Sequence, residues 1–294
     1  MLCPLCGSSA KRDMVLSHTE VWRCILSSCD LQFAWPQPDE RHLSQAYEEL
    51  YYPGNSSDPS GERLAPTTSL VLRQFFESVT QQHPNLVGRR ILDYGCGTAV
   101  LATVAREYGM IPIGIEPDPN ARARVRALNI CPVYADVNEL VASSPDARFD
   151  YVVLWNVIEH LRYPWLEIRK LLQLCAPGAL LIAATPNANC LRARLLRTRW
   201  EERVNPTHLY YFTRTSLAAT FRAAGFGHIV SNRKFVTYPH HGPLRRLFQR
   251  VLAAVGLDGK LEFWATPDAF GDPVSDAGDA NRSRLRAPAR ICSS

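Results

Sequence analysis

The 294-residue sequence contains no run of apolar residues close to the roughly 18 that a membrane-spanning helix needs. Its first residues, MLCPLCG, lack the basic segment and the apolar stretch of a secretory signal. We therefore expect no transmembrane segment, and a cytoplasmic location is the default expectation. The net charge of +5 falls short of the strong basic bias of most nucleic-acid-binding proteins, although it is compatible with an anionic substrate.

Internal repeats are also absent, and from about residue 90 short apolar runs alternate with segments of helical periodicity. Strands are expected at 90–94, 111–116, 132–135, 149–155 and 179–184, with two further candidates at 229–235 and 261–265. Helices are expected at 99–108, 119–128, 165–174 and 215–224. This alternation predicts an α/β fold, with a Rossmann-like, mostly parallel seven-stranded sheet and helices on both faces.

Composition divides the chain into four expected parts. Residues 1–35 carry paired cysteines and too few apolar residues to build a core. Residues 36–88 form a connector with lead-in helices near 42–50 and 67–83, and residues 89–266 contain the α/β pattern. Residues 267–294 are rich in Ala, Asp, Pro, Arg and Ser, which is typical of a disordered tail.

The loop after the first expected strand lacks a feature of dinucleotide-binding loops. Gly95 and Gly97 allow a sharp backbone turn there, but Val100 stands where the third glycine of Gly-x-Gly-x-x-Gly would be. Asp93, directly before the turn, would repel a pyrophosphate. The loop therefore disfavours NAD and favours a neutral or cationic ligand such as S-adenosylmethionine, which carries a sulfonium and an ammonium group and no phosphate.

Two further carboxylates follow neighbouring strands, where ligands of such sheets bind. Glu116 ends the second expected strand, and a carboxylate there can accept hydrogen bonds from both hydroxyls of a ribose. Asp136 follows the third, where an acceptor suits the amino group of an adenine. Together with Asp93 they predict a nucleoside-binding edge of the sheet.

A set of motifs occurs in order between about residues 89 and 226: Asp93-Tyr94-Gly95-Cys96-Gly97-Thr98, Gly114-Ile115-Glu116-Pro117, Asp136, Phe149-Asp150-Tyr151-Val152-Val153, Val157-Ile158-Glu159-His160-Leu161, Ala176-Pro177-Gly178-Ala179-Leu180 and His208-Leu209-Tyr210-Tyr211-Phe212-Thr213. This ordered set resembles the class I S-adenosylmethionine-dependent methyltransferase family, and within it the branch of the ubiquinone-biosynthesis O-methyltransferases. Each motif is weak alone, whereas the order is specific.

The resemblance implies a cofactor site at the ends of the first four strands: Asp93, Tyr94, Gly95, Cys96, Gly97, Glu116, Pro117, Asp136, Val137, Trp155 and Asn156. In it, the loop of Asp93 and its glycines holds the methionine end of the cofactor. Glu116 holds the ribose and Asp136 the adenine, while Trp155 and Asn156 flank the sulfonium. For Cys96, a small buried residue of the loop is the simpler interpretation.

Glu159, His160 and His208 are the candidate catalytic residues, because the resemblance places them beside the transferred methyl group. A histidine can remove the proton of a hydroxyl acceptor near neutral pH. The three residues also match part of a divalent-metal site of related enzymes, but Asn156 stands where those relatives often have another Glu. Structural support of the cofactor pocket is the third alternative.

The cysteines do not form the pattern of a disulfide framework, since there are nine, four of them within the first 29 residues, and no secretory signal. Cys3 and Cys6 form a knuckle, and Cys24 and Cys29 are a second pair with a wider spacing. Four thiolates satisfy tetrahedral zinc and leave no open position, so a structural, zinc-ribbon-like module is expected. Unpaired cysteines of a degenerate ribbon and a redox pair are the alternatives.

Two basic segments are candidates for contacts with partners. Arginines at 192, 194, 197, 199 and 203 lie in an insert before His208 and suit a lid for an anionic substrate, or a solvated helix face. Residues 243–252 are amphipathic and basic. Such a helix can lie on an anionic membrane surface, although packing on its own domain is the more common arrangement.

These observations favour a methyltransferase acting on a small molecule, by O-methylation of a hydroxyl on a sugar, quinone-like or lipid-linked intermediate. An RNA methyltransferase that uses the zinc module and the Arg-rich insert is retained as an alternative. However, the Asn/Asp-Pro-Pro-Tyr/Phe motif of base N-methyltransferases is missing after the fourth strand. A non-catalytic scaffold with the same fold is the other alternative.

Overall fold

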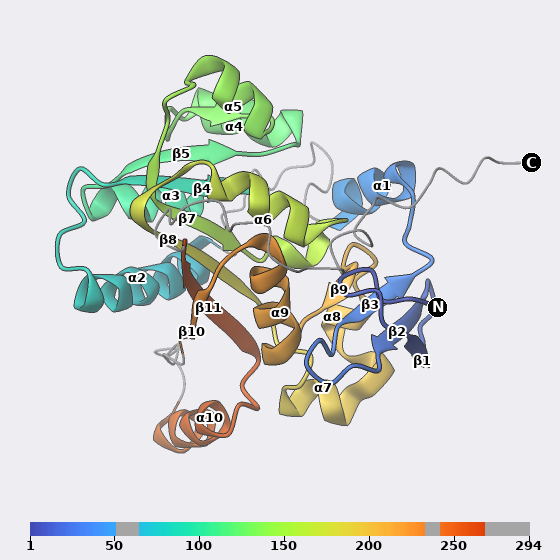
Figure 1. Cartoon of the computed structure of the whole chain (residues 1–294). Coiled ribbons are helices and arrows are strands. Elements are labelled where there is room, and N and C mark those ends of the chain that lie inside the picture. The colour runs from blue at the N-terminus through green and yellow to red at the C-terminus, as the bar shows by residue number, and fades with distance from the viewer. Residues whose placement is uncertain (51–64, 233–241, 268–294) are drawn as a thin grey trace, which may run out of the picture.

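A computed structural model describes residues 1–50, 65–232 and 242–267. Its main sheet has seven strands in the order β10-β11-β8-β7-β4-β5-β6 (Figure 1). Their bounds are β4 (Arg90–Tyr94), β5 (Ile111–Ile115), β6 (Val133–Tyr134), β7 (Phe149–Trp155), β8 (Cys175–Pro186), β10 (His228–Ser231) and β11 (Lys260–Thr266). The strands from β8 to β6 are parallel, and β11 and β10 are antiparallel. The predicted α/β fold with its mostly parallel sheet is confirmed.

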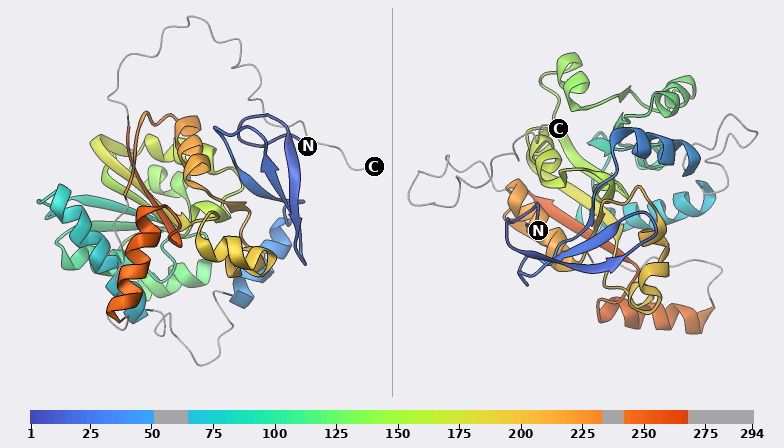
Figure 2. Two further views of the ribbon diagram at one scale, coloured as in Figure 1. Left: turned by 90° about the horizontal axis from the view of Figure 1, so that it is seen from below. Right: turned by 90° about the vertical axis from the view of Figure 1, so that its right-hand side faces the viewer.

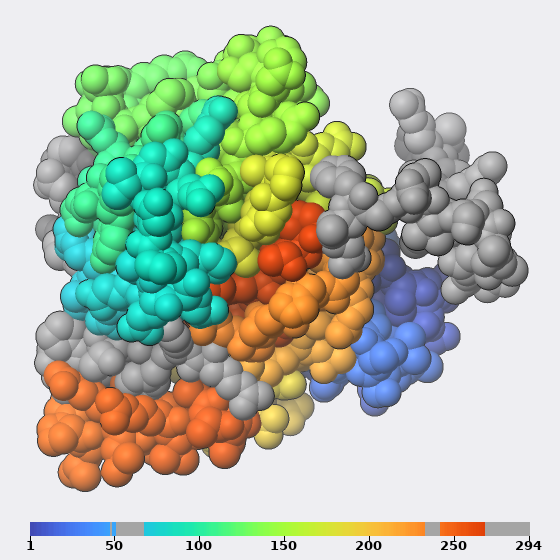
Figure 3. All heavy atoms as spheres, turned by 60° about the vertical axis from the view of Figure 1, so that its left-hand side comes forward, coloured from blue at the N-terminus to red at the C-terminus, as the bar shows by residue number. Residues whose placement is uncertain are grey.

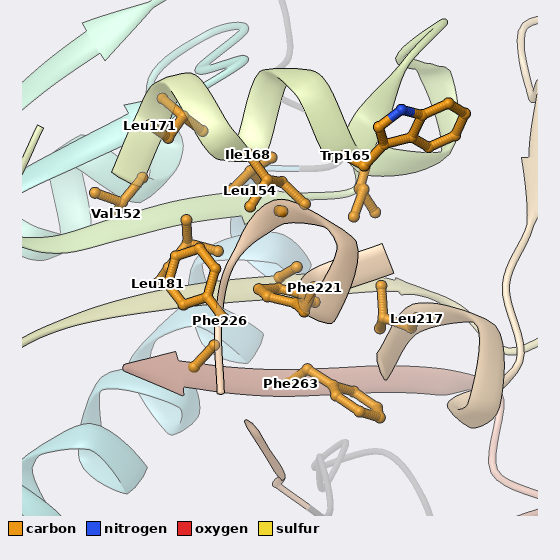
Figure 4. Close-up of a cluster of buried hydrophobic side chains, with 14 of the residues drawn as sticks. Val152, Leu154, Trp165, Ile168, Leu171, Leu181, Leu217, Phe221, Phe226 and Phe263 are labelled. Atoms are coloured by element: carbon orange, nitrogen blue, oxygen red, sulfur yellow. The ribbon is translucent and has the colours of Figure 1, made fainter. Parts of the chain in front are cut away.

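Helices cover both faces of this sheet because the central strands are apolar on both sides. On one face α2 (Ala65–Gln82) and α3 (Val100–Glu107) pack on Ile91, Val153 and Ile182. On the other face, α6 (Pro164–Leu172) and α9 (Arg214–Ala224) pack on the strand residues that alternate with these, such as Val152, Leu154 and Leu181. Figure 4 shows this second layer, in which Ile168, Leu171 and Phe221 lie against β7 and β8.

Two helices flank β5 and the edge strand β6, at the top of Figure 1: α4 (Pro119–Ala127) and α5 (Val137–Ser143). The latter was not predicted, since it is short and buries only Leu140. The part of the predicted strand 229–235 beyond residue 232 lies outside the described residues, as does the predicted disordered tail apart from Pro267. Within the described ranges, no helix has the length and apolarity needed to cross a membrane.

A second sheet of four strands contains the N-terminal residues: β1 (Ala10–Val15), β2 (Glu20–Cys24), β3 (Gln32–Trp35) and β9 (Tyr210–Tyr211). Its last strand, β9, comes from a distant part of the sequence. Phe33 of β3 pairs with Tyr210, and Gln32 pairs with Tyr211. Helix α1 (Glu40–Leu50) follows β3 and lies beside this sheet (Figure 1). The N-terminal residues are thus joined to the segment that carries His208.

The segment between β8 and β9 contains three short helices: α7 (Leu191–Leu196), η2 (Arg197–Arg199) and α8 (Glu201–Val204). One of its arginines is not a solvated or lid residue, because the Arg203 side chain is buried. Its guanidinium donates to the carbonyls of Ala193 (3.1 Å) and Arg197 (3.0 Å) and lies over the Trp200 ring. It also donates to Gln32 Oε1 (3.3 Å), so Arg203 holds the insert together and ties it to β3.

Candidate active site and cysteine cluster

The glycine loop after β4 has a backbone that requires glycine. Gly95 and Gly97 have φ angles of 77° and 52°, in the left-handed region that side chains disfavour. A Cβ on Gly95 would lie 2.6 Å from Val157 Cγ2, whereas a Cβ on Gly97 would meet no atom within 4 Å. The loop is therefore packed on one side, against Val157, and open on the other, where a ligand can approach the backbone.

Replacing Gly95 by alanine is expected to destabilise the protein more than the same change at Gly88. Both glycines have a positive φ (77° and 76°), but only Gly95 has a neighbour that a Cβ would strike. The clash adds about 1–3 kcal/mol to the backbone strain that both variants share. Urea unfolding of the two variants measures this difference, and equal losses of stability would contradict the packing described for Val157.

A buried carboxylate lies beside this loop. Asp93 is 3% exposed, and its Oδ2 has no hydrogen-bond partner among the residues that the structure describes. Burial, and then the charge of Glu116, raise the pKa of Asp93 to about 7. An unsatisfied buried carboxylate is costly, and a cationic group of a ligand would satisfy it. The site therefore fits the ammonium of the predicted cofactor.

Glu116 holds the loop from the neighbouring strand. Its Oε2 accepts from Gly97 N (2.8 Å) and its Oε1 from Asp118 N (2.9 Å), while burial raises its pKa. A carboxylate has about four acceptor positions, so these two bonds leave capacity for ribose hydroxyls. Because β4, β5 and β6 are adjacent and parallel, Asp93, Glu116 and Asp136 lie along the edge of the sheet that is formed by the carboxyl ends of these strands.

The remaining predicted cofactor residues have structural partners of their own. Asp136 caps α5, since its side chain accepts from Glu139 N (2.8 Å). Tyr94 donates from its hydroxyl to Glu167 Oε2 (3.2 Å). Cys96 is buried against Gly114, as its simpler interpretation predicts. Pro117 is exposed and Val137 is half-buried. None of these contacts tests the cofactor roles, which stay predictions.

At the end of β7, Trp155 is enclosed by an aromatic ring and a cation. Phe75 of α2 packs edge-on against it (5.1 Å between centroids), and Lys260 Nζ lies 4.2 Å from the ring centre. Burial lowers the pKa of Lys260 to about 8, although Glu159 and Glu262 oppose this. Asn156 follows with a φ of 55°, and its N–H donates to Ala184 O (2.8 Å). Sequence reasoning missed Lys260, because no local pattern places it beside Trp155.

The structure brings Glu159, His160 and His208 together, with one ligand atom of each within 4.8 Å of the others. The two imidazole rings meet edge to face at 4.6 Å between centroids. Burial lowers the pKa of His160 to about 4 and that of His208 to about 3, so both are neutral at pH 7. His160 Nδ1 lies 3.1 Å from the carbonyl of Thr207. Because a carbonyl only accepts, Nδ1 carries the proton and Nε2 the lone pair.

Glu159 is buried between these histidines and the sheet. Its Oε2 accepts from Thr185 Oγ1 (2.9 Å), and its Oε1 has no partner among the described residues. Burial raises the pKa of Glu159 to about 7. A carboxyl group half satisfied by the protein leaves one oxygen for a ligand, a metal or an acceptor. The geometry is therefore compatible with each of the three predicted roles of the cluster.

A single residue, Leu209, connects this cluster to the N-terminal sheet. Leu209 N donates to Glu159 O (2.9 Å), and Leu209 O accepts from Ala34 N (2.9 Å) of β3. On the same side, Thr213 Oγ1 donates to Asp30 Oδ2 (3.1 Å). The position of His208, one residue before Leu209, is thus set by the segment of Glu159 and by the N-terminal sheet.

The four N-terminal cysteines converge on one point. The Sγ atoms of Cys3 and Cys29 are 3.7 Å apart and those of Cys6 and Cys24 are 3.5 Å apart, and all four lie within 4.8 Å of one another. Tetrahedral zinc with Zn–S bonds of about 2.3 Å needs S···S distances of about 3.8 Å. The sulfur positions therefore fit a tetrathiolate zinc site, and the distances are too long for disulfides.

Comparison with known proteins identifies the family of the α/β part of the chain. A family model described as a methyltransferase domain matches residues 63–231. A ubiquinone biosynthesis O-methyltransferase of Alkalilimnicola ehrlichii is 34% identical over 137 residues, which are 45% of this chain and 55% of the relative. An uncharacterized methyltransferase of Mycobacterium sp. (strain KMS) is 28% identical over 119 residues, or 40% of this chain and 46% of the relative. The chain thus spans about half the length of the curated relatives it matches.

Among solved structures, a methyltransferase from Thermotoga maritima, described as a possible histamine N-methyltransferase, has the same fold. Its TM-score is 0.50 at 18% identity, over 77% of this chain and all of that one. The sheet order, the glycine loop and a family match over more than half of the sequence agree. The chain therefore belongs to the methyltransferase domain family.

Proposed function

We propose that this protein is an S-adenosylmethionine-dependent methyltransferase that methylates a hydroxyl of a small molecule. The buried carboxylate of Asp93 beside the open glycine loop carries this proposal, because its Oδ2 has no partner among the described residues and a cationic ligand group would satisfy it. The ubiquinone biosynthesis O-methyltransferases among its relatives support oxygen as the target atom. A sugar, a quinone-like compound or a lipid-linked intermediate is the proposed class of acceptor.

The cofactor would lie along the edge formed by β4, β5 and β6. In this arrangement Asp93 binds the ammonium group, Glu116 the ribose hydroxyls and Asp136 the adenine amino group. The open side of Gly97 admits the ligand to the backbone. When bound, S-adenosylmethionine supplies an activated methyl group, so the remaining task of the protein is to orient the acceptor and take up its proton.

The cluster of Glu159, His160 and His208 would perform that second task. We assign His160 as the general base, since its ring is neutral at pH 7 and lies against that of His208. A general base accelerates a reaction about 10²–10⁴-fold. Glu159 and His208 are positioning residues in this assignment. Lys260, beside Trp155, would contact an anionic group of the acceptor. A divalent metal held by the same three residues is the competing role.

Residues 1–35 are proposed to form a structural zinc module, residues 36–88 a connector and residues 89–266 the catalytic domain. The convergence of four sulfur atoms supports the zinc, and the module would bind it with Cys3, Cys6, Cys24 and Cys29. Strand β9 then gives the module a second role, as a brace for the segment that carries His208.

Transfer of labelled methyl groups to a panel of phenols, sugars and RNA tests the acceptor class. With an accepted substrate, His160→Ala is expected to lower turnover about 10²–10⁴-fold and to leave S-adenosylhomocysteine affinity unchanged. His228→Ala, an exposed histidine on β10, is the matched control. Full turnover by His160→Ala would refute the base assignment. Loss of activity on chelation with restoration by Mg²⁺ would favour the metal, and labelling of RNA alone would favour the RNA methyltransferase.

A further inference from the structure

Helix α10 (Pro243–Ala254) exposes its apolar residues to solvent. Its large side chains are unusually accessible: Leu244 is 82% exposed, Leu247 59%, Phe248 54%, Val251 52% and the following Val255 62%. They recur at helical spacing and so form one stripe. The opposite side, with the buried Ala253 and the half-buried Arg246 and Gln249, faces the protein. The common arrangement, in which the apolar face packs on the domain, does not apply here.

The charges of α10 are arranged around this stripe. The helix contains three arginines and no acidic residue. At about 100° per residue, the exposed Arg245 and Arg250 fall on opposite flanks of the stripe. An apolar stripe bordered on both sides by cations is the pattern of a helix that lies in the headgroup region of an anionic bilayer. A second copy of the same helix would instead bring arginines against arginines.

The neighbouring insert extends this surface. Leu195 of α7 is 73% exposed, and the adjacent Arg194, Arg197 and Arg199 are exposed too. The lower face in Figure 1 carries both α7 and α10, and the view from below in Figure 2 shows them near each other. In the space-filling view α10 forms a ridge along one edge of the molecule (Figure 3). The two segments that expose these basic and apolar residues therefore lie on one side of the fold.

Hydrogen bonds join the end of α10 to the segment that follows β8, next to the candidate active site. The carbonyls of Gly256 and Asp258, just beyond α10, accept from Asn187 Nδ2 (3.2 and 2.8 Å), and Leu257 O accepts from Leu191 N (3.0 Å). Asn187 directly follows β8, which lies beside Trp155 of β7. Lipid contact at α10 would therefore hold the end of β8 and the start of the insert near the bilayer.

We propose that α10, with the adjoining arginines and Leu195 of the insert, binds the surface of an anionic phospholipid membrane. The apolar stripe enters the headgroup region, and the flanking arginines pair with lipid phosphates. This inference goes beyond the proposed catalytic function and does not require it. Binding of α10 to a bilayer would also bring a methyl acceptor that is embedded in that bilayer within reach of the insert.

Sedimentation of the full chain with lipid vesicles tests the proposal. Binding is expected to vesicles of equal parts phosphatidylglycerol and phosphatidylcholine, to weaken with added salt, and to be much weaker to phosphatidylcholine alone. Arg245→Gln is expected to weaken binding about fivefold. Leu247→Glu and Phe248→Glu are each expected to weaken it at least about tenfold. All three positions are exposed or on the exposed stripe, so thermal unfolding should be unchanged.

The matched controls lie on α4 and directly after it, at the opposite end of the molecule. Leu128→Glu, at a side chain 69% exposed, and Arg124→Gln are expected to bind vesicles like the unaltered protein. Three results would overturn the proposal: no binding to anionic vesicles, equal losses in the control variants, or self-association that Leu247→Glu abolishes. S-adenosylhomocysteine binding is measured in parallel, so a failure of the proposed function is distinguishable from a failure of this one.

Discussion

The Asp93→Asn variant is expected to lose S-adenosylhomocysteine binding while its ligand-free form becomes more stable than the unaltered protein at pH 8. The asparagine keeps the shape of the side chain and removes the charge that the ligand ammonium requires. Removing one member of a buried charge pair costs about 2 kcal/mol or more, so the dissociation constant should rise at least about thirtyfold. Isothermal titration measures the affinity.

The stability change follows from the pKa of Asp93. Its folded pKa of about 7 lies above the value of about 4 in an unfolded chain, so the folded protein retains this proton between those pH values. The stability that this retained proton gives to the folded protein is fully present below pH 4 and is lost as the pH rises through 7. Since one pKa unit corresponds to about 1.4 kcal/mol, the ionised carboxylate destabilises the ligand-free protein by a few kcal/mol. Asparagine does not ionise, so the Asp93→Asn protein keeps this stability at pH 8.

Asp150→Asn is the control for this experiment. Asp150 accepts from Arg89 Nη1 and Arg90 N (both 2.8 Å) at the start of β7, far from the glycine loop. Its replacement should reduce stability and leave S-adenosylhomocysteine affinity unchanged. If Asp93→Asn bound S-adenosylhomocysteine as tightly as the unaltered protein, the cofactor site would have been placed wrongly.

Removal of zinc is expected to unfold residues 1–35 and to reduce turnover while S-adenosylhomocysteine binding persists. Metal binding contributes about 10–16 kcal/mol in small zinc modules. This is larger than the roughly 1.5–3 kcal/mol that burial of one side chain such as Leu31 or Phe33 in the core contributes. Without β3, the carbonyl of Leu209 loses its hydrogen bond from Ala34 N, and His208 is expected to shift relative to Glu159. A displacement of about 1 Å can cost about a hundredfold in rate. Asp93 and Glu116 lie on the main sheet and should be unaffected.

Metal analysis, limited proteolysis and ligand titration separate these effects. Cys24→Ser is expected to release zinc and to expose the N-terminal residues to protease. Cys131→Ser, a half-buried cysteine outside the cluster, is the control and should retain the metal. A Cys24→Ser protein that stayed protease-resistant and metal-loaded would refute the zinc module. Unchanged turnover in a chelated protein would refute the brace formed by β9.

Local patterns were sufficient for the main elements of the fold. The apolar run at 149–155 is β7 residue for residue, and the alternation with helices predicted the parallel sheet. This succeeds because periodicity along the chain records which side of an element is buried. The predicted group of Glu159, His160 and His208 also converges in the structure, although Glu159 and His208 are far apart in sequence. That prediction came from the resemblance to a family rather than from spacing.

Short elements and long-range contacts were missed for a physical reason. Strand β9 has two residues, and its hydrogen-bond partner Phe33 lies more than half the chain away. Arg203 is one of five arginines in the same insert, but it alone among them is buried, and one of its acceptors, Gln32 Oε1, lies in the N-terminal sheet. Nothing in a window of sequence records such partners.

The sequence by itself determined the α/β class, the order of the cofactor carboxylates and the paired cysteines, because each depends on residue type and local period. Only the tertiary structure decided that Lys260 lies over Trp155, that β9 joins the cysteine sheet to His208, and that α10 turns its apolar stripe outward. These depend on which distant surfaces meet, and that is settled by packing of the whole chain rather than by any one segment.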